Sequence, residues 1–133
     1  MSNLGKQRGY IRTGNPYRRI RWFPQWKESM SSSPRADALK GEIGRASSNA
    51  PIQGSNADAV KLALCLVQKA IDTEGWDARI ILVVHDEIQC ECKEEQAENF
   101  KYRLEELMKE ALGAIVKSIP VVVDCKVADC WSK

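Results

Sequence analysis

The chain's single histidine is followed directly by two carboxylates, so that His85, Asp86 and Glu87 stand in a row. Carboxylate oxygens are the ligands that hard cations such as Mg²⁺ take in proteins. Adjacent residues of an extended chain point to opposite sides, so at most one of the two acids can face a shared metal ion squarely. The row therefore indicates a functional site, although a plain exposed turn or one long continuous strand would also accommodate it.

Two apolar segments flank this row and must position it. Residues 80–84 are five consecutive aliphatic residues, four of them β-branched, which predicts a strand buried on both faces. Residues 88–92 alternate, with Ile88, Cys90 and Cys92 on one face, as in a half-buried strand. A hairpin with the polar row at its tip avoids burying these groups without partners. The tip lacks Gly, Pro and Asn, and such departures from ordinary turn chemistry concentrate at functional sites.

The length and composition are those of one ordinary globular domain. The 133 residues are enough to bury a core, and 44% of them are hydrophobic and 29% charged, with a net charge of +2. The first six residues lack the apolar core of a signal peptide. No stretch approaches the ~20 apolar residues of a membrane span. We therefore expect a cytoplasmic protein without a membrane partner.

The cysteines form an odd set without a C-x-x-C pair: Cys65, Cys90, Cys92, Cys125 and Cys130. A disulfide between the two cysteines that share a strand face is geometrically poor. A zinc or thiol-based module built from the last four is an alternative, but their spacing matches no usual ligand pattern. The pattern favours free, mostly buried thiols in a reducing compartment.

Residues 1–27 form a basic aromatic arm that differs in charge from residues 28–133. The arm has no acidic residue and seven basic ones: Lys6, Arg8, Arg12, Arg18, Arg19, Arg21 and Lys27. Aromatic residues are interleaved with them: Tyr10, Tyr17, Trp22, Phe23 and Trp26. Cations beside stacking surfaces suit a nucleic-acid backbone, and they equally suit a basic face with its aromatics folded into the core. Gly-Asn-Pro at residues 14–16 predicts a turn between two short extended pieces.

Two helices are expected after the arm. Ser33 as N-cap with Pro34 in the first helical position predicts a helix that runs to about Arg45. Ser48 or Asn49 then caps a second helix with a proline in its first turn, and a glycine at residue 75 ends it. The buried face of the second helix is marked by four apolar residues at helical spacing: Val60, Leu64, Val67 and Ile71.

A third helix and a further strand complete the expected elements. The acidic residues in 93–98 suit the positive end of a helix. Its apolar stripe is predicted from four residues: Phe100, Leu104, Leu107 and Leu112. Pro120 ends the helix, and residues 121–127 predict a strand. The predicted fold class is α+β, with helices packed on a small, mainly antiparallel sheet.

Three motifs together resemble the C-terminal palm of family A DNA polymerases, the DNA polymerase I type. They are residues 49–54 (Asn-Ala-Pro-Ile-Gln-Gly), residues 57–58 (Ala-Asp) and residues 84–87 (Val-His-Asp-Glu). Residues 9–24 are similar to the stretch that precedes them in that family, and residues 123–131 to its last strand. The likeness covers nearly the whole chain. It implies that the polar tip belongs to the motif-C hairpin of a palm and that residues 28–133 are its C-terminal segment.

The resemblance implies roles for the matched positions. Asp86 matches the second of two catalytic aspartates that hold the Mg²⁺ pair, and Glu87 matches a neighbouring acid of secondary importance. Contacts with primer–template DNA are implied for Arg45, Asn49, Gln53 and His85, and the basic arm adds Arg18 and Arg19. Donors of these types can test base-pair shape in the minor groove without reading sequence.

The sequence carries only part of what the family uses. The first catalytic aspartate and the helix that grips the incoming deoxynucleoside triphosphate have no counterpart here, whereas two-metal catalysis needs carboxylates on both ions. We therefore expect an incomplete Mg²⁺ site, a chain inactive alone, and a need for an upstream polymerase polypeptide. A non-catalytic, polymerase-derived remnant that binds nucleic acid is the alternative. Apolar surface left bare by missing palm elements also predicts self-association.

Overall fold

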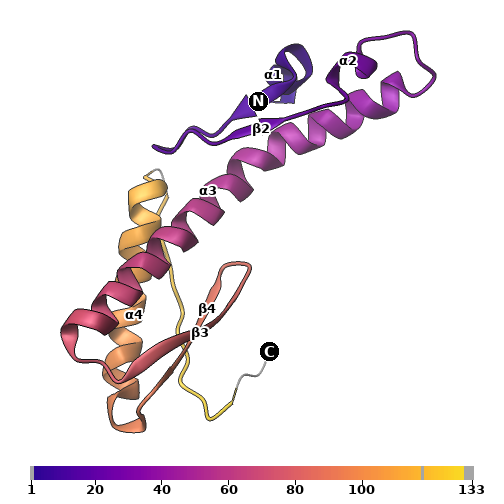
Figure 1. Cartoon of the computed structure of the whole chain (residues 1–133). Coiled ribbons are helices and arrows are strands. Elements are labelled where there is room, and N and C mark those ends of the chain that lie inside the picture. Colours follow the sequence, from indigo (N-terminus) through magenta and orange to yellow (C-terminus); the bar gives the residue numbers. More distant parts are fainter. Residues whose placement is uncertain (1, 118, 131–133) are drawn as a thin grey trace. The chain divides into compact units, whose positions relative to one another are not determined.

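The computed structural model describes residues 2–117 and 119–130 (Figure 1). The chain divides into two compact units, Met1–Ser55 and Asn56–Lys133. One long helix, α3 (Ala36–Glu74), contributes residues to both units. The described strands all pair antiparallel beside helices, which confirms the α+β class. Within the described residues, no helix is both long and apolar enough to cross a membrane.

The first unit combines a small hairpin, two short helices and the beginning of α3. Its other elements are α1 (Ser2–Arg8), β1 (Tyr10–Arg12), β2 (Ile20–Trp22) and α2 (Trp26–Ser29). β1 and β2 pair antiparallel, with Ile11 opposite Arg21. The turn predicted at residues 14–16 lies in the loop between these strands, so the two short extended pieces are confirmed. The helix α1 was not predicted, because its sequence shows neither a cap nor an apolar stripe.

The core of the first unit is formed by three buried apolar side chains: Ile11, Phe23 and Ile43. Trp26 packs against this core, and its indole N–H donates to the Lys6 carbonyl at 2.6 Å. Gly5 brings α1 close to α3. A Cβ at residue 5 would lie 2.9 Å from Phe23 Cε2 and in direct overlap with Ser47 Oγ. The absence of a side chain at Gly5 therefore permits this packing.

The prediction of two helices within residues 34–75 is wrong, because α3 runs unbroken through Pro51. Ser48 was expected to cap the second helix. Instead its hydroxyl donates to the Gly44 carbonyl at 3.2 Å, a bond to the preceding turn that belongs inside a helix. Pro51 removes only one backbone donor, the N–H that would bond to the Ser47 carbonyl, and the helix continues past it.

Both ends of α3 follow recognisable signals. The Ser33 hydroxyl accepts a hydrogen bond from the Arg35 N–H at 3.3 Å, and the helix begins at Ala36, two residues after the predicted Pro34. Gly75, at a φ of +77°, ends the helix as predicted, since a left-handed residue is the usual helix stop.

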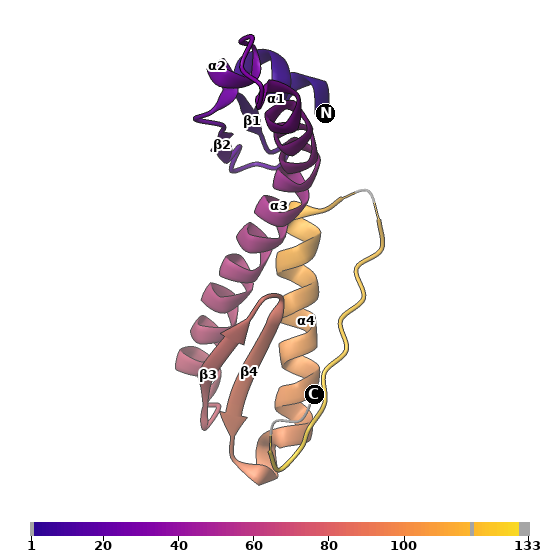
Figure 2. The same ribbon diagram turned by 90° about the vertical axis from the view of Figure 1, so that its right-hand side faces the viewer.

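The second unit packs a two-stranded hairpin against two helices. Its elements after α3 are β3 (Ala78–Val84), β4 (Glu87–Cys92), a 3-10 turn (Glu94–Gln96) and α4 (Ala97–Ile115). Two clusters of buried side chains join them: Val67, Ala70, Phe100, Leu104 and Leu107 in one, and Val60, Ala63, Ile88 and Ala111 in the other. Residues 119–130 run back beside α4 as an extended segment (Figures 1 and 2).

A β-bulge at Ile81 adjusts the register of the β3–β4 hairpin. Ile80 pairs with Cys90, and Val83 pairs with Ile88, so four residues of β3 lie opposite three of β4. The extra residue keeps Ile80 and Val83 opposite the inward-facing side chains of β4. The alternation predicted for residues 88–92 is confirmed at Ile88, which is buried, while the other two inward residues are half-buried.

Three predictions for the second unit need correction. β3 is not buried on both faces: Ile81 is 56% exposed and Leu82 43%, because the described residues give this sheet only two strands. Residues 121–127 are extended but pair with no strand in the described part of the chain. α4 ends at Ile115, five residues before Pro120, and its stripe continues through Ala111 and Ile115, with Leu112 at its edge.

The cysteines are free thiols but are not mostly buried, as had been expected. Cys65 and Cys130 are exposed, and the other three are half-buried. Burial, and then the proximity of the Cys125 and Cys92 thiols, raises the pKa of Cys90 to about 11. Of the residues 123–131 that resemble the family's last strand, residue 131 lies outside the described residues.

The end of α3 is tied to α4 by an ion pair. The Arg103 guanidinium donates to both carboxylate oxygens of Glu74, at 2.6 and 3.0 Å, and the Trp76 indole donates to the same carboxylate at 3.0 Å. Hydrogen bonds from Arg103, and then from Trp76, lower the pKa of Glu74 to about 2.

The Glu74 carboxylate predicts a pH-dependent contribution to stability. Because its folded-state pKa lies below the ordinary 4.5, the stabilisation is complete above pH 4.5 and is lost as the pH falls towards 2. We expect Glu74→Gln to lower the melting temperature at pH 7, and the deficit relative to wild type to shrink below pH 4.5. Glu110→Gln, on the exposed side of α4, is the matched control. A deficit that stays constant down to pH 2 would contradict this role.

The contact at Gly5 predicts a steric effect on the first unit. Gly5→Ala should destabilise it by roughly 1–3 kcal/mol, the usual cost of overpacking, in urea unfolding followed by tryptophan fluorescence. Gly14→Ala is the control, because a Cβ there would meet nothing within 4 Å. Adding Ser47→Ala should recover part of the loss, since it removes the overlapping hydroxyl. Equal stability of the two glycine variants would refute the packing of α1 described above.

Self-association remains a prediction, because aliphatic side chains of β3 are exposed. The exposed aliphatic residues Ile81 and Leu82 lie on a strand whose second edge is unpaired among the described residues. We expect the chain to associate at high concentration in light scattering, and Ile81→Lys with Leu82→Lys to suppress it. Ile52→Lys, which changes an isoleucine of α3 that is 71% exposed, is the control. A monomeric wild type would remove the expectation.

Candidate active-site hairpin and nucleic-acid interface

The predicted hairpin tip is confirmed, with one refinement in its boundaries. β3 ends at Val84 and β4 begins at Glu87, which pairs with Val84, so that His85 and Asp86 form a two-residue turn. His85 adopts a left-handed conformation with a φ of +55°. Such a conformation is uncommon outside glycine, and Asn, Asp and His are the residues that tolerate it best. The turn thus relies on the histidine in place of the usual glycine.

The two acids at the tip have different surroundings, although both are exposed. The Glu87 carboxylate accepts a hydrogen bond from the Gln89 amide at 3.1 Å, which aligns it along the outward face of β4. Asp86 precedes the strand and lies in the turn itself. Asp86 lies in the turn, whereas Glu87 is the first residue of β4. Asp86 is therefore the acid at the end of the hairpin.

The tip alone does not make a magnesium site. Mg²⁺ requires a near-octahedral set of oxygen ligands, often one or two carboxylates completed by waters and substrate phosphates. Within residues 2–117 and 119–130, no three His, Cys, Asp or Glu side chains are grouped so that they could hold a metal ion. The described residues therefore do not form a metal site of three or more such side chains.

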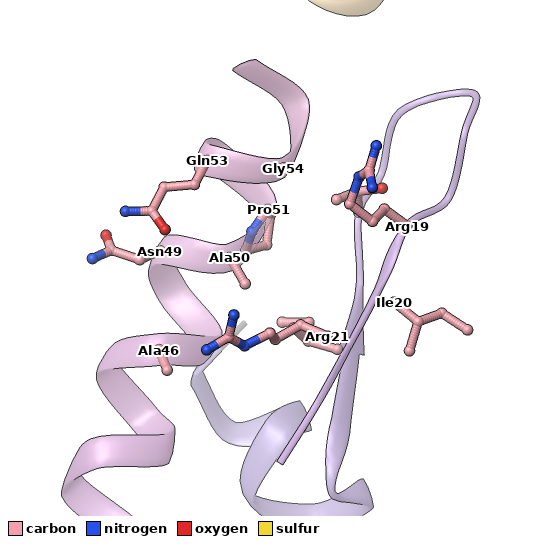
Figure 3. A pocket seen from close by; sticks show the side chains of 11 residues that line it. Arg19, Ile20, Arg21, Ala46, Asn49, Ala50, Pro51, Gln53 and Gly54 are labelled. Atoms are coloured by element: carbon pink, nitrogen blue, oxygen red, sulfur yellow. The ribbon is translucent and has the colours of Figure 1, made fainter. Parts of the chain in front are cut away.

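A separate polar cavity of about 520 Å³ lies in the first unit, between the β1–β2 hairpin and α3 (Figure 3). Its polar lining comprises Thr13, Arg19, Arg21, Asn49 and Gln53, and its apolar lining comprises Ile11, Ile20, Ala46, Ala50, Pro51 and Gly54. No acidic residue contributes to this lining. The charged groups of the lining are therefore two guanidinium groups, and the two amides belong to residues of α3 at its edge.

Figure 3 shows how the polar groups of the cavity are arranged. Asn49 and Gln53 stand one helical turn apart and project from the same side of α3. Arg21 points from β2 towards the helix. Gly54 allows the β1–β2 loop to approach closely, because a Cβ at this residue would lie 3.0 Å from Thr13 Cγ2 and 3.6 Å from Arg19 Cδ.

The loop between β1 and β2 is attached to α3 by a buried asparagine. The Asn15 amide donates to Ser55 Oγ at 3.1 Å, and its oxygen accepts from the Thr13 hydroxyl at 3.0 Å and from the Arg18 N–H at 3.2 Å. Asn15 is only 7% exposed, so these bonds satisfy a group that would otherwise be costly to bury. The arginines that follow are thereby held at a fixed place along the helix.

The structure brings together some of the predicted DNA-binding residues. Arg19, Asn49 and Gln53 line the same cavity. Arg18 lies in the loop with a φ of +48° and does not line the cavity. The Arg45 side chain folds back along α3, with a guanidinium nitrogen 3.4 Å from the position of a Cβ at Gly41.

The remaining predicted residues, His85, Asp86 and Glu87, form the tip in the second unit. Two residues of the first unit were missed as site residues, Arg21 in the cavity and Asn15 beneath the loop. Strand alternation was the available signal for Arg21, because it places residue 21 on the opposite face from Trp22.

Comparison with known proteins identifies the family. The pattern of DNA polymerase family A matches residues 2–133. DNA polymerase I of Aquifex aeolicus is 44% identical over 85 residues, which are 64% of this chain and 15% of that protein. DNA polymerase I of Chloroflexus aurantiacus is 30% identical over 130 residues, 98% of this chain and 13% of that protein.

A plant relative shows the same extent of similarity. The chloroplastic/mitochondrial DNA polymerase I B of Arabidopsis thaliana is 34% identical over 128 residues, 94% of this chain and 11% of that protein. The chain thus corresponds to 11–15% of the length of these three relatives. Because the similarity extends over nearly all of its residues, the chain belongs to DNA polymerase family A.

Proposed function

We propose that this chain is the C-terminal palm portion of a DNA-directed DNA polymerase and that Asp86 is one of its catalytic carboxylates. The observation that carries the proposal is the turn at the tip of the β3–β4 hairpin. His85 takes up the left-handed conformation that the reversal needs, and Asp86 is left exposed at the extremity. Strain of this kind concentrates at functional sites.

The neighbours of Asp86 have supporting roles in this proposal. Glu87 is the secondary acid, since its carboxylate is already engaged by Gln89 and lies along β4. His85 supports the turn and contacts the primer strand near its end. The imidazole can do this because it is exposed and lies beside the acid.

We propose that this chain binds Mg²⁺ together with another part of a complete polymerase. Polymerases of this family use Mg²⁺, and metal ions there stabilise the charges of phosphoryl transfer. The described residues supply one ligand in Asp86 and no complete site. In this proposal the remaining ligands and the contacts to a deoxynucleoside triphosphate come from the upstream portion of a complete polymerase, with which this chain would act.

The amide and guanidinium groups of the first unit are proposed to hold the primer–template duplex. Asn49 and Gln53 present donors from one side of α3, and the minor groove offers acceptors that scarcely depend on sequence. Arg19 in the cavity, with Arg18 and Arg45 nearby on the loop and helix, adds positive charge for the phosphate backbone. This arrangement suits an enzyme that must bind any duplex sequence.

A non-catalytic function is compatible with the same geometry. Asp86 has no grouped metal ligands among the described residues, so a remnant that binds DNA without extending a primer would have the same structure. The two functions differ in what happens when the other polymerase elements are supplied.

Primer extension with a complementing polypeptide distinguishes them. The chain alone should not extend a primer, and a mixture with a polypeptide that carries the other catalytic elements should do so. Asp86→Ala should slow the mixture at least several hundredfold, because loss of a metal-binding carboxylate costs several kcal/mol and each ~1.4 kcal/mol is a factor of ten. Glu87→Ala should slow it less.

The control for this experiment is Asp77→Ala, which removes an exposed aspartate just before β3. It should leave extension unchanged. If the mixture forms a stable complex and Asp86→Ala extends as fast as wild type, the catalytic proposal is wrong and the non-catalytic one replaces it.

A further inference from the structure

The β1–β2 hairpin has an inner face that carries one cation. Ile11 and Arg21 are direct partners across the strands, so their side chains leave the same face of the sheet. Ile11 is buried in the core of the first unit, which identifies this face as the one that packs towards α3. Arg21 therefore points inward, as Figure 3 also shows.

The outer face of the same hairpin carries different side chains. Tyr10 and Trp22 are partners there and contact each other, with ring centroids 5.0 Å apart. Arg12 and Ile20 form the neighbouring pair on this face. Arg12 and Arg21 thus lie on adjacent strands of one small sheet but on opposite faces, and both are exposed.

Arg21 has no counter-charge in the part of the chain that the structure describes. It forms no ion pair there, and the lining of the cavity that it enters contains no aspartate or glutamate. Beside it the cavity wall is apolar at Ile11 and Ala46. An exposed guanidinium with no anionic partner can engage an anion that enters the same space through charge-assisted hydrogen bonds.

The neighbouring amides indicate which anion fits. Asn49 and Gln53 are about 6 Å apart along the axis of α3, since a helix rises 1.5 Å per residue. Nucleotides of one strand follow each other at about 3.4 Å, so the two amides span roughly two nucleotides. If the two amides meet base edges of one strand, the anion nearest to Arg21 is a phosphate of that same strand.

We propose that Arg21 binds a backbone phosphate of the nucleic-acid strand whose base edges Asn49 and Gln53 contact. This inference rests on the proposed function and adds a subsite to it. The guanidinium can engage a phosphate with two parallel N–H donors, which fixes the register of the strand in the cavity. The contact carries no sequence information, as a polymerase substrate requires.

The test measures binding of a fluorescent primer–template duplex to the whole chain by anisotropy at several salt concentrations. Arg21→Ala should weaken binding on the order of tenfold at low salt, the effect expected for a charged hydrogen bond. The slope of log K against log salt should become shallower by about 0.9, the value for one lost phosphate contact. Arg21→Lys should keep the slope, because it keeps the charge, while losing part of the affinity.

Arg12→Ala is the matched control, because it removes the same charge from the outer face of the same sheet. It should leave the salt slope largely unchanged. Equal losses of slope for Arg12→Ala and Arg21→Ala would overturn the inner-face subsite and leave duplex binding by the chain intact. Loss of slope in Arg21→Lys would also overturn it, since a change of fold would then explain both variants. A wild type without salt-dependent duplex binding would instead overturn the proposed DNA-binding function itself.

Discussion

Both cores of this chain depend on the uninterrupted hydrogen-bond ladder of α3. Residues of its first part, such as Ile43 and Ser47, pack in the first unit, and residues of its second part, such as Val60 and Val67, pack in the second. Pro51 leaves one bond of that ladder unmade and the helix tolerates the loss.

Much of the fold was predictable where one physical signal dominated. The glycine stop of α3, the buried stripe of α4 and the hairpin around His85 each follow from local chemistry or from periodicity. The division of α3 into two helices was wrong, because a serine and a proline near a helix start look the same as a serine and a proline within a helix. Only the hydrogen bond from Ser48 to Gly44 separates the two cases.

The burial of β3 was wrong for a different reason. An apolar run such as residues 80–84 predicts that a strand is suited to the interior of a sheet, but it does not count the strands that surround it. In the described residues, β3 has one neighbour, and Ile81 and Leu82 are left exposed. For the same reason residues 121–127 have the composition of a strand without a partner strand. The site shows the same limit, since family motifs indicated Asn49 and Gln53, whereas Arg21 required the strand register to be known.

The reactivity of the half-buried Cys90 thiol can report whether the core of the second unit is intact. A thiol with a pKa of about 11 is ionised at neutral pH in only about one molecule in ten thousand, and the thiolate is the form that alkylating reagents attack. Its packing beside Ile80 and Ala63 further restricts access while the hairpin stays on its helices. Cys65 on α3 is exposed and has no such shelter. The rate at which Cys90 is modified relative to Cys65 therefore measures how often the hairpin that carries Asp86 opens.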